Sequence, residues 1–450
     1  MSEEIIQNKV DIIVVGAGPA GVSAAITAAR GGKKVVLVER APYAGAKNMY
    51  GGVIYSHAAQ EIFPNYKEAP VERYISKHNY VLLSDEDSTE ISYKNPSHEK
   101  CAFVAIRAKW DKWCVQEAVK EGVYFAPDTL VKELIVKDGK VVGITTDVED
   151  FYADVVIIAD GVNSLLARQI GLREDIKPKN VALAVKEVIR LAPEVIEKRF
   201  SLKEGTGCAM ELVGGPLAQM FGMGIVYTNK DSVAVGIGVS LEDLKTRKVK
   251  PYELLDAVKK HPFVAELIEG GELLEYSAHL IPEGGYKAVP KLYTDGAMVA
   301  GDAAGLVNNV HFEGTNLAMI SGKLAAQTAL EAFERGDFSS NTLCLYKKML
   351  ENSFVLKDLK TYKDVVHTLS GRAGSFLTYY PAKVNEFFSI FTCADGVPKK
   401  GNFQKFTKEF FTKRSLSELF KDAIAGIKIV FGILTVSYTH LRAHETEADL

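Results

Sequence analysis

The chain has 450 residues and a formal net charge of −3, with 25% charged and 47% apolar residues. This composition is that of an ordinary globular protein, and the length predicts two to three domains. The near-neutral charge gives no global indication of nucleic-acid binding. The five cysteines form no CxxC pair, which argues against a disulfide framework, a bound metal and an iron–sulfur cluster in this chain.

The first fifty residues have the pattern of a dinucleotide-binding βαβ unit. An apolar run at 11–15 leads into the hexapeptide GAGPAG at 16–21, and a small-residue helical stretch follows at 22–30. A second apolar run at 35–38 then ends on an acidic residue. In such a unit the glycines permit a tight turn, close approach of a pyrophosphate and close helix packing, while the acid accepts hydrogen bonds from ribose. The predicted cofactor-binding residues are Gly16, Gly18, Pro19, Ala20, Gly21, Glu39 and Arg40.

The segment after this unit predicts a helix and several strands. Residues 109–121 have the pattern of an amphipathic helix. The β-like runs 131–136 and 141–146 are joined through Asp138-Gly139, which is a hairpin signal. A fully apolar strand at 155–158 then leads to Asp160-Gly161. There is a single GxGxxG in the sequence, so the fold is expected to hold one dinucleotide.

The second half of the chain changes from strands to helices. Between 181 and 240 the apolar runs are short and Gly-rich, and 221–227 and 232–239 flank a polar turn that predicts a second hairpin. The buried-strand pattern returns at 298–302, and a long helix is expected at 316–336. The last hundred residues are predicted to be helical.

Later motifs favour FAD over a nicotinamide cofactor. Asp302, in the run AGDAAG, can accept a hydrogen bond from a ribityl chain. The sequence EGTN at 313–316 opens the long helix, whose N–H groups can stabilise negative charge at the flavin N1/O2 edge. Arg107 could reach a phosphate, and another strand end carries Asp160. These motifs add Arg107, Asp160, Gly161, Gly301, Asp302, Gly314 and Asn316 to the predicted cofactor-binding residues.

In this order the motifs resemble those of the FAD-dependent FixC and electron-transfer-flavoprotein:quinone oxidoreductase family, with geranylgeranyl reductases as relatives. The resemblance runs from about Val10 to about Val436. The stretch GAKNMYGG at 45–52 is similar to the KNMxGG stretch of FixC-type proteins, which lies beside the isoalloxazine ring, and the run 305–319 also looks like theirs. The resemblance adds Gly51 and Gly52 to the predicted cofactor-binding residues.

The resemblance implies an α/β fold of the para-hydroxybenzoate-hydroxylase-like class. We expect a discontinuous FAD-binding Rossmann-like βαβ domain at 1–77, 101–178 and 285–338. A β-rich substrate or quinone domain is expected at 78–100 and 179–284, and a helical C-terminal region at 339–436. Residues 437–450 resemble translated cloning or sequencing-adaptor sequence and are excluded from functional reasoning.

In function, the resemblance implies an oxidoreductase subunit that accepts electrons from an electron-transfer flavoprotein and passes them toward quinone. A ferredoxin-like subunit is the implied further partner, because the chain lacks the cysteines for an iron–sulfur cluster of its own. Two alternatives remain open. One is a geranylgeranyl or prenyl reductase-type flavoenzyme, and the other is a subunit that holds FAD only as a structural element of a complex.

Electron transfer needs a positioned ring rather than a general base, so no strong catalytic residue is predicted. Lys47 and Asn48 are candidates to contact the flavin N5/O4 edge, with a loop lysine and a turn asparagine as the alternative. His311, near Glu313, is a candidate to move protons during quinone reduction, with a loop-capping histidine as the alternative. His57 is read as structural.

The segment 399–436 contains eight basic and three acidic residues, with phenylalanines interleaved. This pattern fits a membrane-surface face, a partner-docking face or a solvated helical cap. No signal peptide is apparent, and no apolar run reaches the roughly 18 residues of a transmembrane helix. We therefore expect a cytoplasmic protein, with peripheral contact at the inner face of the cytoplasmic membrane left open.

Overall fold

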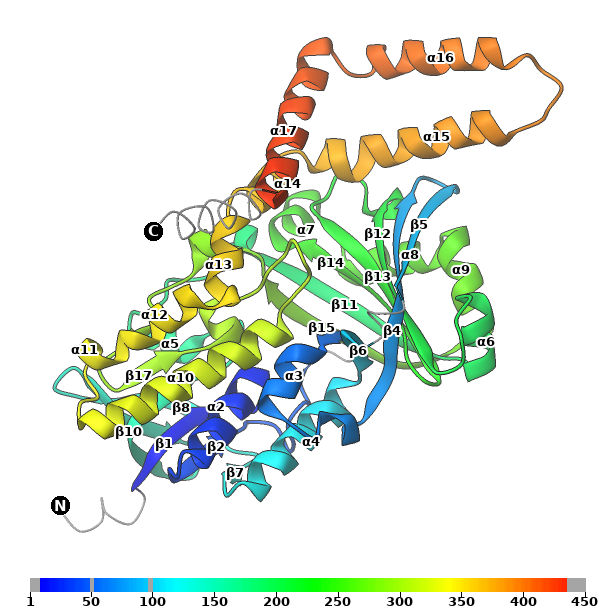
Figure 1. Ribbon diagram of the computed structural model, residues 1–450. Coiled ribbons are helices and arrows are strands. Elements are labelled where there is room, and N and C mark those ends of the chain that lie inside the picture. Colours follow the sequence, from blue (N-terminus) through cyan, green and yellow to red (C-terminus); the bar gives the residue numbers. More distant parts are fainter. Residues whose placement is uncertain (1–8, 49–51, 96–99, 435–450) are drawn as a thin grey trace, which may run out of the picture. The chain divides into compact units, whose positions relative to one another are not determined.

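The computed structural model describes residues 9–48, 52–95 and 100–434 (Figure 1). The predicted site residue Gly51 and the tail 437–450 lie outside the described residues. The chain forms two compact units, each built from three segments. The first unit comprises 1–75, 97–182 and 277–360, and the second comprises 76–96, 183–276 and 361–450. The predicted functional domains stay predictions, because compactness alone assigns no function to a unit.

The first unit is built around a parallel sheet. Strand β1 (Lys9–Val15) pairs in parallel with β2 (Val35–Val38) and with β10 (Asp150–Ile158). The sheet continues through β7 (Tyr124–Ala126) on one side and β17 (Ala297–Val299) on the other. The apolar runs of β1, β2, β10 and β17 are buried almost completely, as expected for a parallel sheet covered on both faces, whereas β7 lies at the edge of the sheet. The predicted βαβ unit is confirmed.

Three helices pack on this sheet, and small residues let two of them come very close. These two are α2 (Pro19–Arg30) and α10 (Thr315–Arg335), and the third is α4 (Arg107–Lys120). A Cβ built on Gly322 of α10 would lie 1.9 Å from the carbonyl oxygen of Ala20. Since no side chain fits there, the glycine permits the close crossing that holds the start of α2 against α10.

Shorter elements complete the first unit. The hairpin of β8 (Val131–Lys137) and β9 (Lys140–Thr146) is confirmed, with Asp138 and Gly139 at φ of +50° and +79° in its turn. Strand β6 pairs with β3 on one side and with the first residues of β4 (Val71–Leu83) on the other. The remaining elements are β3 (Gly52–Tyr55), α3 (Ser56–Ile62), β6 (Ala102–Ala105), α5 (Leu165–Gln169), β16 (Tyr293–Thr294), α11 (Ser340–Leu343), α12 (Leu345–Asn352) and α13 (Phe354–Thr361).

The second unit contains a mostly antiparallel sheet with an apolar core on one face. Its strand order is β15-β11-β14-β13-β12-β4, with β5 paired to β4. The predicted hairpin is confirmed as β13 and β14. The strands are β4 (Val71–Leu83), β5 (Ser88–Lys94), β11 (Val181–Arg190), β12 (Thr206–Gly214), β13 (Gly222–Thr228), β14 (Ser232–Ser240) and β15 (Glu272–Pro282). The core also includes side chains of α6 (Pro193–Arg199), α7 (Leu241–Arg247), α8 (Pro251–Lys260) and α9 (Pro262–Ile268).

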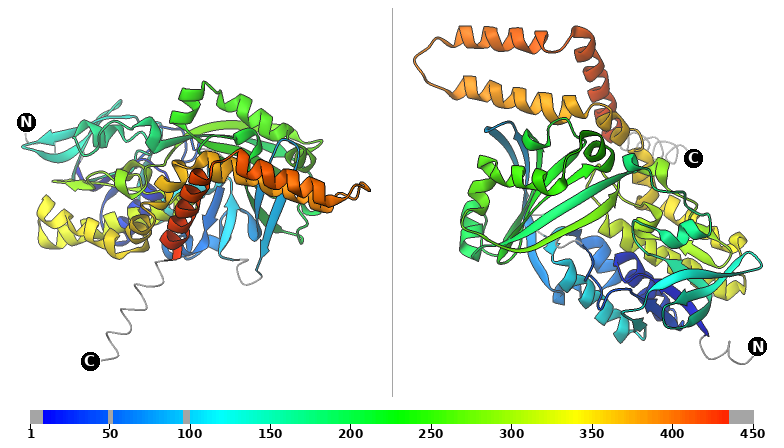
Figure 2. Two further views of the ribbon diagram at one scale, coloured as in Figure 1. Left: turned by 90° about the horizontal axis from the view of Figure 1, so that it is seen from above. Right: turned by 180° about the vertical axis from the view of Figure 1, so that it is seen from behind.

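The end of the second unit is helical, as predicted. Helices α15 (Tyr380–Thr392) and α16 (Lys399–Thr412) lie side by side, and α17 (Leu416–Leu434) packs on α14 (Val365–Ser370) (Figures 1 and 2). A π-helical turn at Ser375–Tyr379 precedes α15. Aromatic side chains join α15 to α16, with Phe387 5.8 Å from Phe403 between ring centroids. Some of the phenylalanines interleaved with basic residues therefore face a neighbouring helix.

Candidate dinucleotide-binding site

The turn between β1 and α2 can be made only with glycine at two of its positions. Gly16 has φ of +99°, and a Cβ on it would lie 2.3 Å from the carbonyl oxygen of Ala159. A Cβ on Gly21 would lie 1.8 Å from the carbonyl oxygen of Gly16. Both glycines are therefore explained by close backbone packing within the protein.

Gly18 is different, because nothing in the protein explains the absence of a side chain there. A Cβ on Gly18 would have no atom within 4 Å, and its φ of −78° is open to any residue. Gly18 is also the N-cap of α2, where no side chain accepts from the helix N–H groups. An open space before an uncapped helix N-terminus is the arrangement that binds a phosphate group.

Glu39, at the end of β2, is held by the backbone of the two loops that flank it. Its Oε2 accepts a hydrogen bond from the Ala17 N–H, and its Oε1 accepts one from the Ala41 N–H, both at 3.0 Å. A carboxylate oxygen has a second lone pair, so these bonds position Glu39 and leave it able to accept from a ligand. The next residue, Arg40, is exposed.

A polar network joins the loop 45–48 to the start of α4. Arg107 makes two hydrogen bonds of 2.8 Å to Asp111, and the Asn48 side-chain amide donates to the same carboxylate. Burial, the largest single influence, lowers the pKa of Arg107, but the charge and hydrogen bonds of Asp111 together with the Asp302 charge outweigh it, so this pKa is raised. Gly45, at φ of +90°, approaches so closely that a Cβ would lie 2.6 Å from the Arg107 carbonyl oxygen. The sequence reading missed Asp111, although its spacing of one helical turn from Arg107 is the signal for such a pair.

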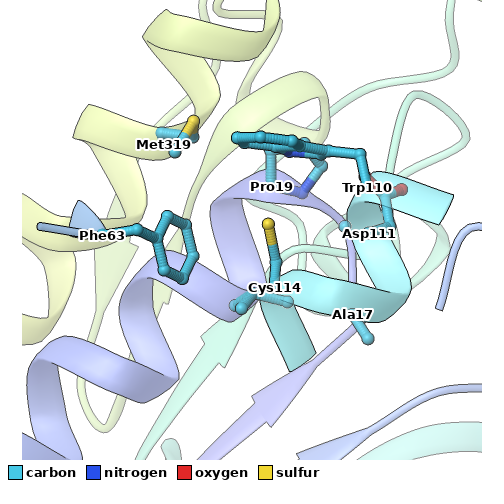
Figure 3. Close-up of a pocket in the computed structure, with 9 residues that line it drawn as sticks. Ala17, Pro19, Phe63, Trp110, Asp111, Cys114 and Met319 are labelled. Atoms are coloured by element: carbon cyan, nitrogen blue, oxygen red, sulfur yellow. The ribbon is translucent and has the colours of Figure 1, made fainter. Parts of the chain in front are cut away.

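A narrow pocket lies beside the start of α2 (Figure 3). Its wall includes Phe63, Trp110, Cys114 and Met319, whose side chains are turned toward it in Figure 3. Asp111 and the glycine turn contribute its polar side. Burial raises the pKa of the Cys114 thiol well above its ordinary value, so this cysteine is an unreactive packing residue.

Two predicted residues, Asp160 and Gly161, lie directly after β10, where the described residues leave a hydrogen-bond acceptor unpaired and a space unfilled. The Asp160 side chain accepts a hydrogen bond of 3.1 Å at Oδ2 from the Leu166 N–H, while its buried Oδ1 has no partner among the described residues. Burial raises the pKa of Asp160 above its ordinary value. Gly161, at φ of +77°, would place a Cβ in open space. A buried acceptor without a partner is costly unless a ligand or water satisfies it.

Asp302 lies in a short 3-10 turn, Gly301–Ala304, that follows β17. Burial raises its pKa, while His279, Arg107 and Arg173 act in the opposite direction. Asp302 also raises the pKa of His279 against the larger lowering effect of burial. His279 and Arg173 were missed by the sequence reading, since neither belongs to a recognisable motif. The cluster gathers charged and titratable groups from two segments of the first unit, 97–182 and 277–360.

The start of α10 carries the last two predicted residues. Gly314 is the N-cap without a side-chain acceptor, so the first N–H groups of α10 are left for water or a ligand. Asn316 is fully buried, and its Oδ1 has no partner among the described residues. Burial and the Asp358 charge raise the pKa of the neighbouring Glu313. This helix start therefore has the donors and the orphaned polar atom expected of a binding site.

The remaining candidates lie at more exposed positions. Lys47 and His311 are exposed, and the His311 carbonyl oxygen accepts from the Tyr55 hydroxyl at 3.2 Å. Gly52 begins β3, and a Cβ there would meet nothing. The ring of His57 packs edge-on against Phe354 at 5.3 Å, and burial lowers its pKa. The position of His57 fits its interpretation as structural. Neither Lys47 nor His311 belongs to the buried charged cluster around Asp302.

Family models match three successive parts of the chain. Residues 11–168 match the FAD dependent oxidoreductase family, 181–281 match the ETF-QO, ubiquinone-binding domain, and 365–430 match the ETF-QO/FixC family C-terminal domain. The chain is 42% identical to Protein FixC of Bradyrhizobium diazoefficiens, over 93% of this chain and 98% of that protein. It is 37% identical to the "Probable electron transfer flavoprotein-quinone oxidoreductase YdiS" of Escherichia coli K12, again over 93% and 98%.

Solved structures of low sequence identity share the fold. A geranylgeranyl bacteriochlorophyll reductase-like protein from Thermoplasma acidophilum aligns with a TM-score of 0.69 at 21% identity, over 90% of this chain and 97% of that one. A triple mutant of the flavin-dependent brominase Bmp2 aligns with a TM-score of 0.65 at 16% identity, over 93% and 99%. The predicted flavoprotein fold class is thereby confirmed.

The residues of the first unit fit FAD as the cofactor. The open space at Gly18, the uncapped starts of α2 and α10, and the orphaned Oδ1 atoms of Asp160 and Asn316 supply the donors and acceptors that a dinucleotide needs. The family models and the high-identity relatives agree with this chemistry. The chain therefore belongs to the FixC and electron-transfer-flavoprotein:quinone oxidoreductase family of FAD-dependent oxidoreductases.

Proposed function

We propose that this protein accepts electrons from an electron-transfer flavoprotein and passes them to a quinone. The observation that carries the proposal is the match of 181–281 to a ubiquinone-binding domain, in a chain whose residues 11–168 match an FAD dependent oxidoreductase. Support for the donor comes from the name of the 37% identical relative, an electron transfer flavoprotein-quinone oxidoreductase. The test is reduction of the holoprotein by such a flavoprotein, followed by its oxidation with quinone; a flavin that is not reduced, or not reoxidised, would contradict the proposal.

Within this proposal, the first unit holds the cofactor. The N–H groups that follow Gly18 would bind the pyrophosphate, and Glu39 would accept from the adenosine ribose. Asp302 would accept from the ribityl chain, and the start of α10, with Gly314 and Asn316, would stabilise negative charge on the flavin. FAD, when bound, supplies the ability to take up and release electrons. The protein contributes position, exclusion of water and the local charge.

Asp302→Ala should weaken FAD binding by about 1.5–3 kcal/mol, the range for a hydrogen bond that involves a charged group. Burial raises the pKa of Asp302, so its carboxylate does not favour folding at neutral pH, and thermal stability of the apoprotein should not fall. Titration of the apoprotein with FAD and thermal unfolding of the same sample measure both. A loss of stability with unchanged FAD affinity would show that Asp302 only caps its turn.

NADH alone should reduce the flavin slowly, because the sequence has a single GxGxxG and this site is assigned to FAD. Stopped-flow mixing of the anaerobic holoprotein with NADH measures the rate. The control is the same protein mixed with reduced electron-transfer flavoprotein, which should reduce it much faster. Rapid reduction at physiological NADH would favour an independent reductase.

We also propose a separate ferredoxin-like subunit as a partner. The five cysteines of the chain are too dispersed in sequence to bind an iron–sulfur cluster in a motif, and the described cysteines are all free thiols. An iron–sulfur centre in the electron path would then have to come from another chain.

Contact with a membrane is proposed at α17. None of the described helices combines the length and the hydropathy needed to cross a bilayer. Apolar side chains instead follow one exposed stripe of α17 at helical spacing, with Lys421 and Lys428 along one edge of it, while Asp422 and Ala425 on the other side of the helix are buried. This is the pattern of a helix that lies in a membrane interface. The stripe consists of Phe420, Ile424, Ile427, Phe431 and Leu434.

Ile427→Glu should weaken binding to anionic vesicles several-fold, because it places a charge in the centre of this stripe. The matched control is Thr407→Glu, which adds the same charge at an exposed position of α16. Truncation after Val436 should leave binding unchanged, whereas truncation before Lys399 should abolish it. Vesicle co-sedimentation at low salt is the measurement. If the full chain ignores anionic vesicles, membrane contact must be made by a partner.

A further inference from the structure

A buried carboxyl group in the second unit lacks a hydrogen-bond partner. Glu211 lies in β12, is 7% exposed, and its Oε2 has no partner among the described residues. Its neighbours in the strand, Met210 and Leu212, belong to the apolar core of the unit. Because side chains alternate along a strand, Glu211 faces the opposite side of the sheet. The core therefore does not explain the carboxyl group.

Small, apolar and aromatic residues share the face that carries Glu211. Glu211 is opposite Ile225 of β13, which is opposite Gly236 of β14. Two residues away along their strands, Ala209 and Ala234 both pair with Tyr227, and these two alanines are 1% and 0% exposed. This end of the face is therefore covered, and a ligand would reach Glu211 from the β4 side.

An exposed apolar strip continues from this face along the β4–β5 hairpin. Val81 and Leu83 of β4 point into the core, so Tyr80 lies on the same face of the sheet as Glu211. Burial raises the pKa of Tyr80, and the charge of Glu211 raises it further. Tyr80 pairs with Ile91, and these two side chains are 49% and 57% exposed. The strip offers apolar surface to a lipid-soluble molecule that approaches Glu211.

We propose that Glu211 is a catalytic acid that donates a proton to a carbonyl oxygen of the bound quinone. The inference rests on the proposed quinone reduction and lies within the segment 181–281 that matches a ubiquinone-binding domain. Burial raises the pKa of the Glu211 carboxyl to about 7, so a proton is present for transfer at neutral pH. The Oε2 atom without a partner is the position from which it is donated.

The step balances as follows for a quinone that becomes a quinol. The quinone gains two electrons and two protons. The reduced cofactor of the proposed function would provide the electrons and release its own two protons to water, which balances the protons that water supplies. Glu211 gives one proton to one carbonyl oxygen, and water gives the second proton to the other oxygen. The Glu211 carboxylate is then protonated again from water, so the protein is unchanged after the reaction.

The test compares quinone with an acceptor that takes no proton. The full-length holoprotein is reduced anaerobically, and its reoxidation by a ubiquinone with one isoprene unit or by ferricyanide is followed by stopped flow. Glu211→Gln should slow reoxidation by ubiquinone about 10²-fold, a typical contribution of general acid catalysis. It should leave the ferricyanide rate unchanged. Glu211→Asp, which keeps an acid, should restore part of the ubiquinone rate.

The matched control is Glu187→Gln. Glu187 is also a buried carboxyl group of this sheet, but it lies on the core side of β11 between Val185 and Ile189 and bonds to Lys259 at 2.7 Å. Its replacement should leave both acceptor rates unchanged. Thermal unfolding of each variant shows whether the sheet remains folded.

The pH profile gives an independent readout. A carboxyl group with a pKa of about 7 carries its proton below that pH, so the wild-type ubiquinone rate should fall as pH rises above it, and Glu211→Gln should remove this fall. Tyr80 and Cys208 interact electrostatically with Glu211, but the pKa of Tyr80 is raised and that of Cys208 is raised to about 12, so neither titrates in this range.

The outcomes separate the inference from the proposed function. If wild type reduces ubiquinone and Glu211→Gln does so equally fast, Glu211 is not the acid and the proposed function stands. If Glu211→Gln slows ferricyanide as much as ubiquinone, the variant has damaged electron transfer itself, and the proposed role is also wrong. If wild type does not reduce ubiquinone at all, the proposed function fails and the inference fails with it.

Discussion

Gly18→Val should yield a folded protein that purifies without its flavin. The valine side chain would enter the open space before α2, where a Cβ meets no protein atom, and would occupy the approach of the pyrophosphate. The backbone at Gly18, with φ of −78°, accepts valine without strain. We expect FAD affinity to fall at least about 10²-fold, or about 2.7 kcal/mol. FAD titration and circular dichroism of the apoprotein measure the two properties.

Two neighbouring variants are the controls. Gly21→Val should fail to fold, because its Cβ would lie 1.8 Å from the Gly16 carbonyl oxygen. Gly18→Ala, with a single methyl group, should fold normally and lose only part of the affinity. Retention of wild-type FAD affinity by Gly18→Val would contradict the assignment of this turn as the pyrophosphate site.

Asp422→Ala should be the most destabilising substitution in the C-terminal helices. Its carboxylate, 1% exposed, accepts from Arg414 at 2.7 Å and from Arg372 at 3.2 Å. It also accepts from the hydroxyls of Ser375 and Tyr380. Removal leaves the two guanidinium groups with only the more exposed Glu418 as a shared carboxylate, and breaking a buried pair costs about 3–5 kcal/mol. We expect about 3 kcal/mol, because both arginines remain partly exposed.

Chemical denaturation of the holoprotein measures this loss of unfolding free energy. Glu418→Gln is the control. Glu418 lies on α17 like Asp422 and pairs with Arg372, but its side chain is 39% exposed, and exposed pairs contribute little. Equal stability of Asp422→Ala and wild type would mean that the network does not hold α17 in place. The turn Ser375–Tyr379, which contributes Ser375 to the network, would then need another explanation.

The sequence predicted those parts of the site whose chemistry is local. The glycine turn, the acid after β2 and the start of α10 each carry their signal within a few residues, because backbone geometry demands particular residue types there. The hairpin turn at Asp138-Gly139 was predictable for the same reason. These elements depend little on the rest of the fold.

The parts that could not be predicted depend on contacts between distant segments. His279 interacts with Asp302 only because β15 ends in the first unit, and no local sequence pattern predicts this interaction. The residues around Glu211 in the sequence do not distinguish it from other strand glutamates. Its burial opposite Ile225 depends on how the strands pair in the sheet. The phenylalanines of α16 and α17 look alike in sequence, yet Phe403 packs toward α15 whereas Phe420 is 68% exposed.

The central claim is that electrons pass through this protein from an electron-transfer flavoprotein to a quinone. The most direct measurement is anaerobic and stepwise. Reduced electron-transfer flavoprotein is added to the oxidised holoprotein, the flavin spectrum of the isolated product is recorded, and ubiquinone is then added. We predict that the flavin is first reduced and then reoxidised, with one quinol formed for each two-electron oxidation. A flavin that the flavoprotein cannot reduce, or that stays reduced when ubiquinone is present, would contradict the account.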